Sequence, residues 1–270
     1  MNALNMNRLR MMLRWNYLDN KKSFLRALAV CILLFSAFSL LTEISTRLDP
    51  YTMTYEHILA IRHNYVHSLV SCYVWCCIMV WVVSGATIFR NMRSKQSRAT
   101  YLLLPASSLE KYLARWIWVT VSPLVIAAVT FFSTDLLQYV LGLALRPGLE
   151  SSMTVYMATE GLSDFFSYTN AMAAVLIVGI IVFFQSAFVL GGTFYLKHPV
   201  LLTMVTMYIC SMVFGLMFLV YDEAVKSDSA LLEYVSAVLI YGAVLLDYWQ
   251  SYLLFRSTPV IGRKWVNLPE

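Results

Sequence analysis

Six long apolar runs decide what this chain can fold into. They cover residues 24–41, 70–89, 116–134, 169–190, 200–221 and 231–255. A helix needs about 20 apolar residues to cross the ~30 Å hydrocarbon core of a bilayer, so these runs are long enough to span it. Only 13% of the 270 residues are charged, against about 25% in an average soluble domain. The sequence therefore predicts an all-α, polytopic membrane protein with six transmembrane helices.

The distribution of lysine and arginine predicts the orientation of these spans. All but four of the 20 basic residues fall in segments that share one side of the membrane. Arg47, Arg62, Arg146 and Lys226 fall on the other side, together with most of the acidic residues. Basic residues are enriched in cytoplasmic loops, so we expect both termini in the cytoplasm, in a multi-pass protein of the bacterial cytoplasmic (inner) membrane. The net charge of +5 is the difference between a basic inner side and an acidic outer side. Because membrane topology explains this charge, we expect no nucleic-acid binding.

The segment before the first run has a helical pattern of its own. Met6, Leu9 and Leu13 recur at spacings of three and four, with Arg10 and Arg14 beside them. This pattern is typical of an amphipathic helix on the membrane surface, with its basic residues facing anionic lipid heads. We expect residues 1–270 to form a single transmembrane domain, with the amphipathic helix at 1–23, six spans within 24–255 and a cytoplasmic tail at 256–270.

The longest cytoplasmic connection, residues 90–115, changes character along its length. A basic first part gives way to the short apolar segment 101–104, which Pro105 ends. Ser107 stands three positions before Glu110, the capping-box pattern in which each side chain binds a backbone N–H of the other residue. We expect a helix that begins here and continues without a flexible break into span three. An ordinary interfacial connector with positive charge would have the same spacing.

The second half of this connection has the sequence Tyr101-Leu102-Leu103-Leu104-Pro105-Ala106-Ser107-Ser108-Leu109-Glu110-Lys111-Tyr112-Leu113. This stretch resembles the coupling-helix region of ATP-binding cassette (ABC) transporter type-2 permeases. In that family the loop between spans two and three carries a leucine-proline-small-Ser/Thr-Lys/Arg/Glu pattern. The resemblance implies a subunit that pairs with a second permease copy, as a homo- or heterodimer, and docks into a separate ATPase that holds ATP and Mg²⁺. The docking residues it implies are Arg93, Lys95, Arg98, Pro105, Ser107, Ser108, Glu110 and Lys111.

The sequence departs from that family on its outer side. Many members carry re-entrant helices between spans five and six, whereas residues 222–230 leave room only for a turn. The longer outer segments here are residues 42–69 and 146–168.

Catalytic motifs are absent from the sequence. It contains no Gly-x-x-x-x-Gly-Lys-Ser/Thr phosphate loop, although Gly191 and Gly192 end an apolar run. The spans hold no Ser/His/Asp set and no paired glutamates. We therefore expect the chain not to be an enzyme and to bind no cofactor of its own, with any ATP hydrolysis performed by a partner subunit.

Three polar residues inside the spans are candidates for a substrate path, because a buried carboxylate in a membrane is costly. Asp135 lies ~28 Å from the inner end of span three. At that depth its charge is also explained by a helix end that reaches the polar headgroups. Asp247 lies ~24 Å from the outer end of span six, where it could pair with Arg256. Gln185 in span four also fits an inter-helix hydrogen bond. The different depths of the two aspartates argue against a protease that needs a carboxylate pair.

The predicted outer segment before span two places Glu56, His63 and His67 on one helical face. His63 and His67 are one turn apart and could ligate a metal, but further ligands are needed and Glu56 lies ~10 Å away along the axis. We expect a solvated amphipathic face rather than a metal site. A helix that continues into span two as one long rod also fits the pattern.

Two functions fit these features. The first is the permease subunit of an ABC exporter, which moves an amphipathic or hydrophobic substrate by alternating access. The second is a non-transporting scaffold, assembly or sensor protein that docks a cytoplasmic partner on the same basic inner face. A partner with a phosphate loop distinguishes the first from the second.

Overall fold

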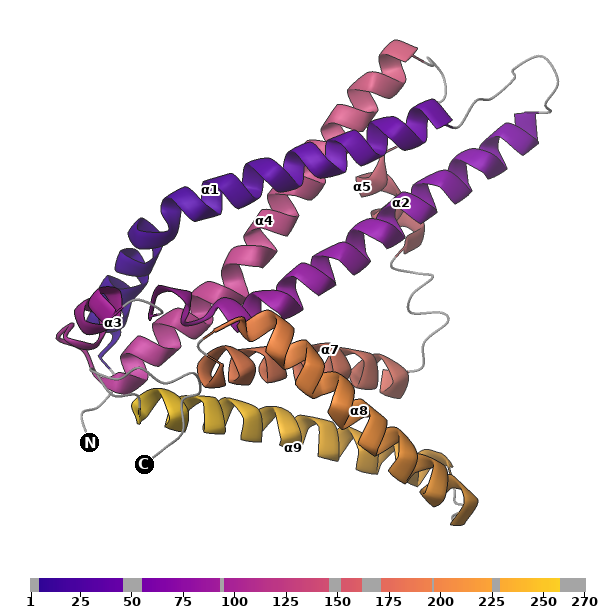
Figure 1. The fold of residues 1–270 in the computed structure, drawn as a ribbon. Coiled ribbons are helices and arrows are strands. Elements are labelled where there is room, and N and C mark those ends of the chain that lie inside the picture. The colour runs from indigo at the N-terminus through magenta and orange to yellow at the C-terminus, as the bar shows by residue number, and fades with distance from the viewer. Residues whose placement is uncertain are drawn as a thin grey trace. The chain divides into compact units, whose positions relative to one another are not determined.

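The computed structural model describes residues 5–45, 55–92, 95–145, 152–161, 171–195, 197–224 and 229–257. Their helices are α1 (Met6–Ser45), α2 (Tyr55–Ser84), η1 (Gly85–Thr87), η2 (Arg90–Met92), α3 (Lys95–Leu102), α4 (Ser108–Leu145), α5 (Met153–Tyr156), η3 (Met157–Gly161), α7 (Ala171–Phe194), α8 (Pro199–Ala224) and α9 (Ser229–Arg256) (Figure 1). Across the described residues every regular element is a helix and no strand is present. The predicted all-α class is confirmed.

Five of these helices are long and apolar enough to cross a membrane. The five segments are Met6–Thr42, His63–Thr87, Ser108–Leu143, Ala171–Phe194 and Tyr234–Arg256. Helix α8 has 26 residues, and the apolar segment found within it covers Pro199–Ile209. The chain is therefore a helical membrane protein with five candidate spans in its described part, and the count of six stays a prediction.

Helices α1 and α2 are longer than the apolar runs that predicted them. Helix α1 has 40 residues, so the amphipathic segment and the first span form one unbroken helix rather than two elements. Helix α2 has 30 residues and joins the outer segment to span two as one rod. The sequences of both helices contain neither glycine nor proline, the residues that most often end a helix.

Helix α4 continues through an internal proline for 38 residues. Pro123 has no N–H to donate to the carbonyl of Val119, four residues earlier. That carbonyl instead accepts a hydrogen bond from Ser84 Oγ at 3.1 Å, and the next carbonyl, of Thr120, accepts one from Trp81 Nε1 at 3.0 Å. Side chains at the end of α2 therefore donate hydrogen bonds to two carbonyls of α4 next to the place where the proline interrupts the hydrogen bonding of that helix.

The chain divides into two compact units, each described here by itself. The first unit comprises the described residues of Met1–Leu18, Val80–Val121 and Ala171–Glu270, and the second those of Asp19–Met79 and Ser122–Asn170. Helices α1, α2 and α4 contribute residues to both units. The single transmembrane domain expected over residues 1–270 stays a prediction.

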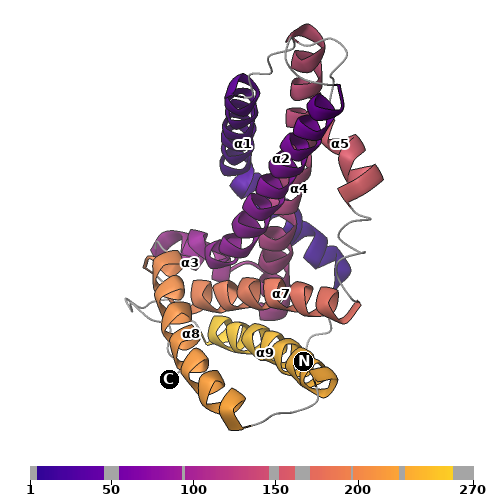
Figure 2. The ribbon, with the colours of Figure 1, turned by 90° about the vertical axis from the view of Figure 1, so that its right-hand side faces the viewer.

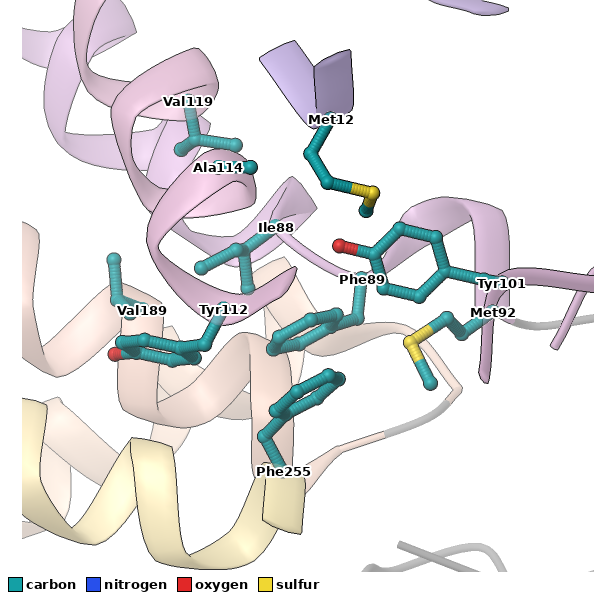
Figure 3. Close-up of a cluster of buried hydrophobic side chains, with 10 residues drawn as sticks. All are labelled: Met12, Ile88, Phe89, Met92, Tyr101, Tyr112, Ala114, Val119, Val189 and Phe255. Carbon is teal, nitrogen blue, oxygen red and sulfur yellow. The ribbon is translucent and has the colours of Figure 1, made fainter. Parts of the chain in front are cut away.

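The core of the first unit collects side chains from segments far apart in the sequence (Figure 3). Met12 of α1, Tyr112 of α4, Val189 of α7 and Phe255 of α9 are all buried in it. The rings of Phe89 and Phe255 stack with centroids 4.8 Å apart, and Figure 3 shows them face to face. This apolar core connects the start of the chain to its last helix.

Small residues allow α7 to pack closely within the first unit (Figure 2). A Cβ added to Gly192 would lie 2.9 Å from three backbone atoms of Ala86, and one added to Gly85 would lie 2.9 Å from the carbonyl oxygen of Gln185. A Cβ on Gly191 would lie 1.8 Å from Thr203 Oγ1 of α8. Such small residues at helix interfaces let backbones approach in membranes, where van der Waals packing drives association.

The second unit packs the remaining parts of α1, α2 and α4 around Tyr73. Its ring lies 4.7 Å from that of Phe35 and 5.2 Å from that of Phe131, measured between centroids. Its hydroxyl donates a hydrogen bond to the carbonyl of Ala127. A second cluster, formed by Val66, Leu69, Val70, Met153 and Tyr156, packs α5 onto α2.

Candidate functional site

The predicted capping box is present at the start of α4 and is confirmed. Ser107 N donates to Glu110 Oε2 at 2.8 Å, and Glu110 N donates to Ser107 Oγ at 3.2 Å. Two N–H groups that the helix leaves without partners are thereby satisfied. Helix α4 begins at Ser108 and runs on as one piece into the candidate span, so the loop is joined to that span without a break.

The second oxygen of Glu110 ties the start of α1 to the same point. Glu110 Oε1 accepts a hydrogen bond from Asn5 N at 2.9 Å and lies 3.8 Å from Arg8 Nε. The Glu110 side chain is fully buried, whereas that of Arg8 is exposed. One carboxylate therefore caps α4 and holds the first turn of α1.

Two basic residues of the loop are buried and bind backbone carbonyls. Lys111 Nζ donates to the carbonyl of Leu102 at 2.6 Å, at the end of α3. Arg98 Nε donates to the carbonyl of Met92 at 3.1 Å, at the end of η2. Cationic side chains commonly satisfy carbonyls at a helix C-terminus. These two hydrogen bonds fix α3 against its neighbours.

Arg115 connects α1, α3 and α4, and its role was not predicted. Its guanidinium carbon lies 5.5 Å from the ring centroid of Trp15 and 4.8 Å from that of Tyr101, within the range of cation–π attraction. Burial raises the pKa of Tyr101 to about 12. Its hydroxyl donates to the carbonyl of Lys111 at 2.7 Å. Trp15, Tyr101 and Arg115 are too far apart in sequence for any spacing rule to relate them.

The turn between α3 and α4 and the first residues of α4 present an apolar tip. Leu103 is 74% exposed and Leu109 is 40% exposed, and Pro105 and Ser108 between them are also exposed. We call residues 103–109 the loop tip. Exposed leucines on a short, internally fixed turn are available to a partner.

The structure separates the eight residues that the resemblance assigned to docking. Arg98, Glu110 and Lys111 are buried, Ser107 is half-buried in the capping box, Pro105 and Ser108 are exposed, and Arg93 and the side chain of Lys95 lie outside the described residues. The three buried side chains bind atoms of their own chain. They therefore position the loop tip, and docking by the eight residues stays a prediction.

Helices α7 and α9 are joined by two adjacent polar links. The Tyr248 hydroxyl donates to Gln185 Oε1, and Ser186 Oγ donates to Asp247 Oδ2 at 2.9 Å. Two of the predicted path residues, Gln185 and Asp247, therefore lie in neighbouring positions across one helix interface. Gln185 forms the inter-helix hydrogen bond that its residue type suggested. In the part of the chain that the structure describes, Asp247 is hydrogen-bonded to Ser186 and forms no ion pair with Arg256.

Asp135, the third predicted path residue, belongs to the second unit and holds α5. Its Oδ1 accepts from Met153 N at 2.6 Å, and its Oδ2 accepts from Ser152 Oγ at 2.9 Å and from Thr154 N at 3.3 Å. An anionic side chain at a helix N-terminus binds the free N–H groups and the positive end of the dipole. Asp135 is thus an anchor for residues 152–154, and a place in a substrate path stays a prediction.

His63 and His67 lie on the exposed part of α2 beside α5. The two imidazole centroids lie 5.5 Å and 6.1 Å from that of Tyr156, both in edge-on contact. The side chain of Glu56 lies outside the described residues. Among the described residues, no group of three His, Cys, Asp or Glu side chains is placed to hold a metal ion.

Comparison of the chain with protein-family models, with curated proteins and with solved structures gave no match. The functional assignment therefore depends on the geometry described above and on the resemblance of residues 101–113.

Proposed function

We propose that the chain is the permease subunit of an ABC exporter, driven by a separate ATPase and moving an amphipathic or hydrophobic substrate. In this proposal α8 is span five and brings the number of spans to six, both termini lie in the cytoplasm of a bacterium, and a second permease copy completes the translocation path. Five apolar helices of sufficient length support the membrane location. The distribution of basic residues supports the orientation.

The observation that carries the proposal is a rigid loop with an exposed apolar tip. Glu110, Lys111 and Arg98 fix the base of the loop through internal hydrogen bonds. Leu103 and Leu109 remain exposed at its tip. A docking element needs both properties, because a flexible loop would absorb the movement of a partner instead of transmitting it.

The same geometry gives a route from the loop tip to the membrane. Helix α4 begins within the loop and contains the candidate span Ser108–Leu143, so a displacement of the tip moves the start of that span. Glu110 and Arg115 join the first turns of α1 to this point. Closure of a partner ATPase around nucleotide would thereby reorient spans one and three together, as alternating access requires.

Apolar substitutions at the loop tip test this assignment. We expect the double variant Leu103→Ser and Leu109→Ser to bind an ATPase encoded beside its gene about 100-fold more weakly, because burying a leucine contributes roughly 1.5 to 3 kcal/mol. The measurement is co-purification of the coexpressed subunits, followed by titration of the purified ATPase onto the permease in detergent.

The matched control is Leu18→Ser, which makes the same change at a leucine of α1 that is 60% exposed. It should leave binding unchanged. If the wild type and the double variant bind the ATPase equally, the loop tip is not part of the interface. Stable capture of a partner without a phosphate loop would favour the scaffold or sensor function instead.

A further inference from the structure

A groove of about 1070 Å³ lies between α7, α8 and α9 of the first unit. Pockets for small molecules commonly measure about 300 to 1000 Å³, so this one is large enough for a drug-sized ligand. Helix α7 packs against both α8 and α9, and Figure 2 shows α7 and α9 side by side. The groove belongs to one chain and lies within one unit.

Aromatic rings supply much of the groove wall on the side of α7. Phe183, Phe184, Phe194 and Tyr195 all line it. The rings of Phe183 and Phe184 lie 6.0 Å apart and those of Phe194 and Tyr195 lie 4.9 Å apart, measured between centroids. Aromatic faces carry partial negative charge and attract cations, most strongly where water is scarce.

One acidic side chain faces this apolar space. Among the described residues that line the groove, Asp247 is the one acid and Arg256 the one base. Arg256 follows Asp247 by nine positions on α9, about 13 Å along the axis, so Arg256 lies at the helix end while Asp247 lies deeper. Ser186 Oγ is bonded to Asp247 Oδ2, and a carboxylate carries further acceptor positions.

We propose that this groove binds a lipophilic organic cation, with Asp247 as its counter-ion. The inference rests on the proposed exporter function and names its substrate class. A hydrophobic cation satisfies the apolar wall, the aromatic faces and the carboxylate together. An anion would meet repulsion from Asp247, and a neutral ligand would cover the carboxylate without compensating its charge.

Two ions of nearly identical shape and opposite charge provide the test. The full-length protein is purified in detergent, and the binding of tetraphenylphosphonium and of tetraphenylborate is measured by equilibrium dialysis. We expect saturable binding of the phosphonium, at least ten-fold tighter than that of the borate. Asp247→Asn should weaken phosphonium binding at least ten-fold, and Asp247→Glu should retain most of it.

Phe184→Leu keeps the site apolar at a modest loss of volume and removes a π face, so it should weaken phosphonium binding and leave borate binding unchanged. This variant keeps the proposal testable if Asp247→Asn fails to fold. Equal affinity for the two ions, or phosphonium binding insensitive to both Asp247→Asn and Phe184→Leu, would overturn the proposal. The measurement contains no ATPase, so its failure is distinct from a failure of the loop-tip interface.

Discussion

Replacing Gly192 with alanine is expected to destabilise the first unit by about 3 kcal/mol, because the added methyl group has no space. Its Cβ would lie 2.9 Å from the Cα, C and O atoms of Ala86. Backbone atoms cannot rotate away as a flexible side chain can, so α7 and η1 would have to separate. The measurement is thermal unfolding of the detergent-purified protein, with a lowered midpoint as the expected result.

Gly242→Ala is the matched control for this prediction. It makes the same substitution in α9, where a Cβ would meet no atom within 4 Å. We expect its unfolding midpoint to equal or slightly exceed that of the wild type, since alanine favours helix over glycine by about 1 kcal/mol. If Gly192→Ala and Gly242→Ala unfold at the same temperature, the close contact between α7 and η1 is not present.

Replacing Glu110 with alanine is expected to release the first turn of α1 from the start of α4. The substitution removes the acceptor for Asn5 N and Ser107 N and the partner of Arg8. Hydrogen bonds to a charged group contribute roughly 1.5 to 3 kcal/mol each and are not additive, so we expect a loss of about 2 kcal/mol. Amide hydrogen exchange should accelerate in residues 5–12 and 107–112.

Ser108→Ala serves as the control for Glu110→Ala, because Ser108 is exposed and adjacent to the same helix start. Its exchange pattern should match that of the wild type. Unchanged protection of residues 5–12 in Glu110→Ala would show that α1 is held by other contacts, such as Trp15 with Arg115.

Local sequence patterns predicted the local structure of this chain well. The Ser107 and Glu110 spacing gave the capping box that starts α4, because both partners lie within one helical turn. Apolar runs predicted the helical class, since length and composition alone decide whether a helix can span a bilayer. The joining of the amphipathic segment to the first span was missed, because the division at residue 23 followed polarity and ignored the lack of any helix-breaking residue.

Burial of polar residues could not be predicted from the same patterns. The sequence pattern indicates that Arg98 and Lys111 are surface charges. Their partners are the backbone carbonyls of Met92 and Leu102. Every residue carries such a carbonyl, so no sequence pattern identifies which one is bound. Asp135 binds residues 152–154, and no sequence motif relates these positions. The link between Ser186 and Asp247 depends on the rotation of α7 against α9, which tertiary packing sets.

Photo-crosslinking from position 103 identifies the protein that the loop tip touches in the native membrane. A photoreactive amino acid is placed at Leu103 and, in a separate variant, at Leu18, and the crosslinked proteins are identified by mass spectrometry. We expect position 103 to capture a subunit with a Gly-x-x-x-x-Gly-Lys-Ser/Thr phosphate loop, and position 18 not to capture it. Capture of that subunit equally from both positions, or capture only of proteins without a phosphate loop, would contradict this expectation.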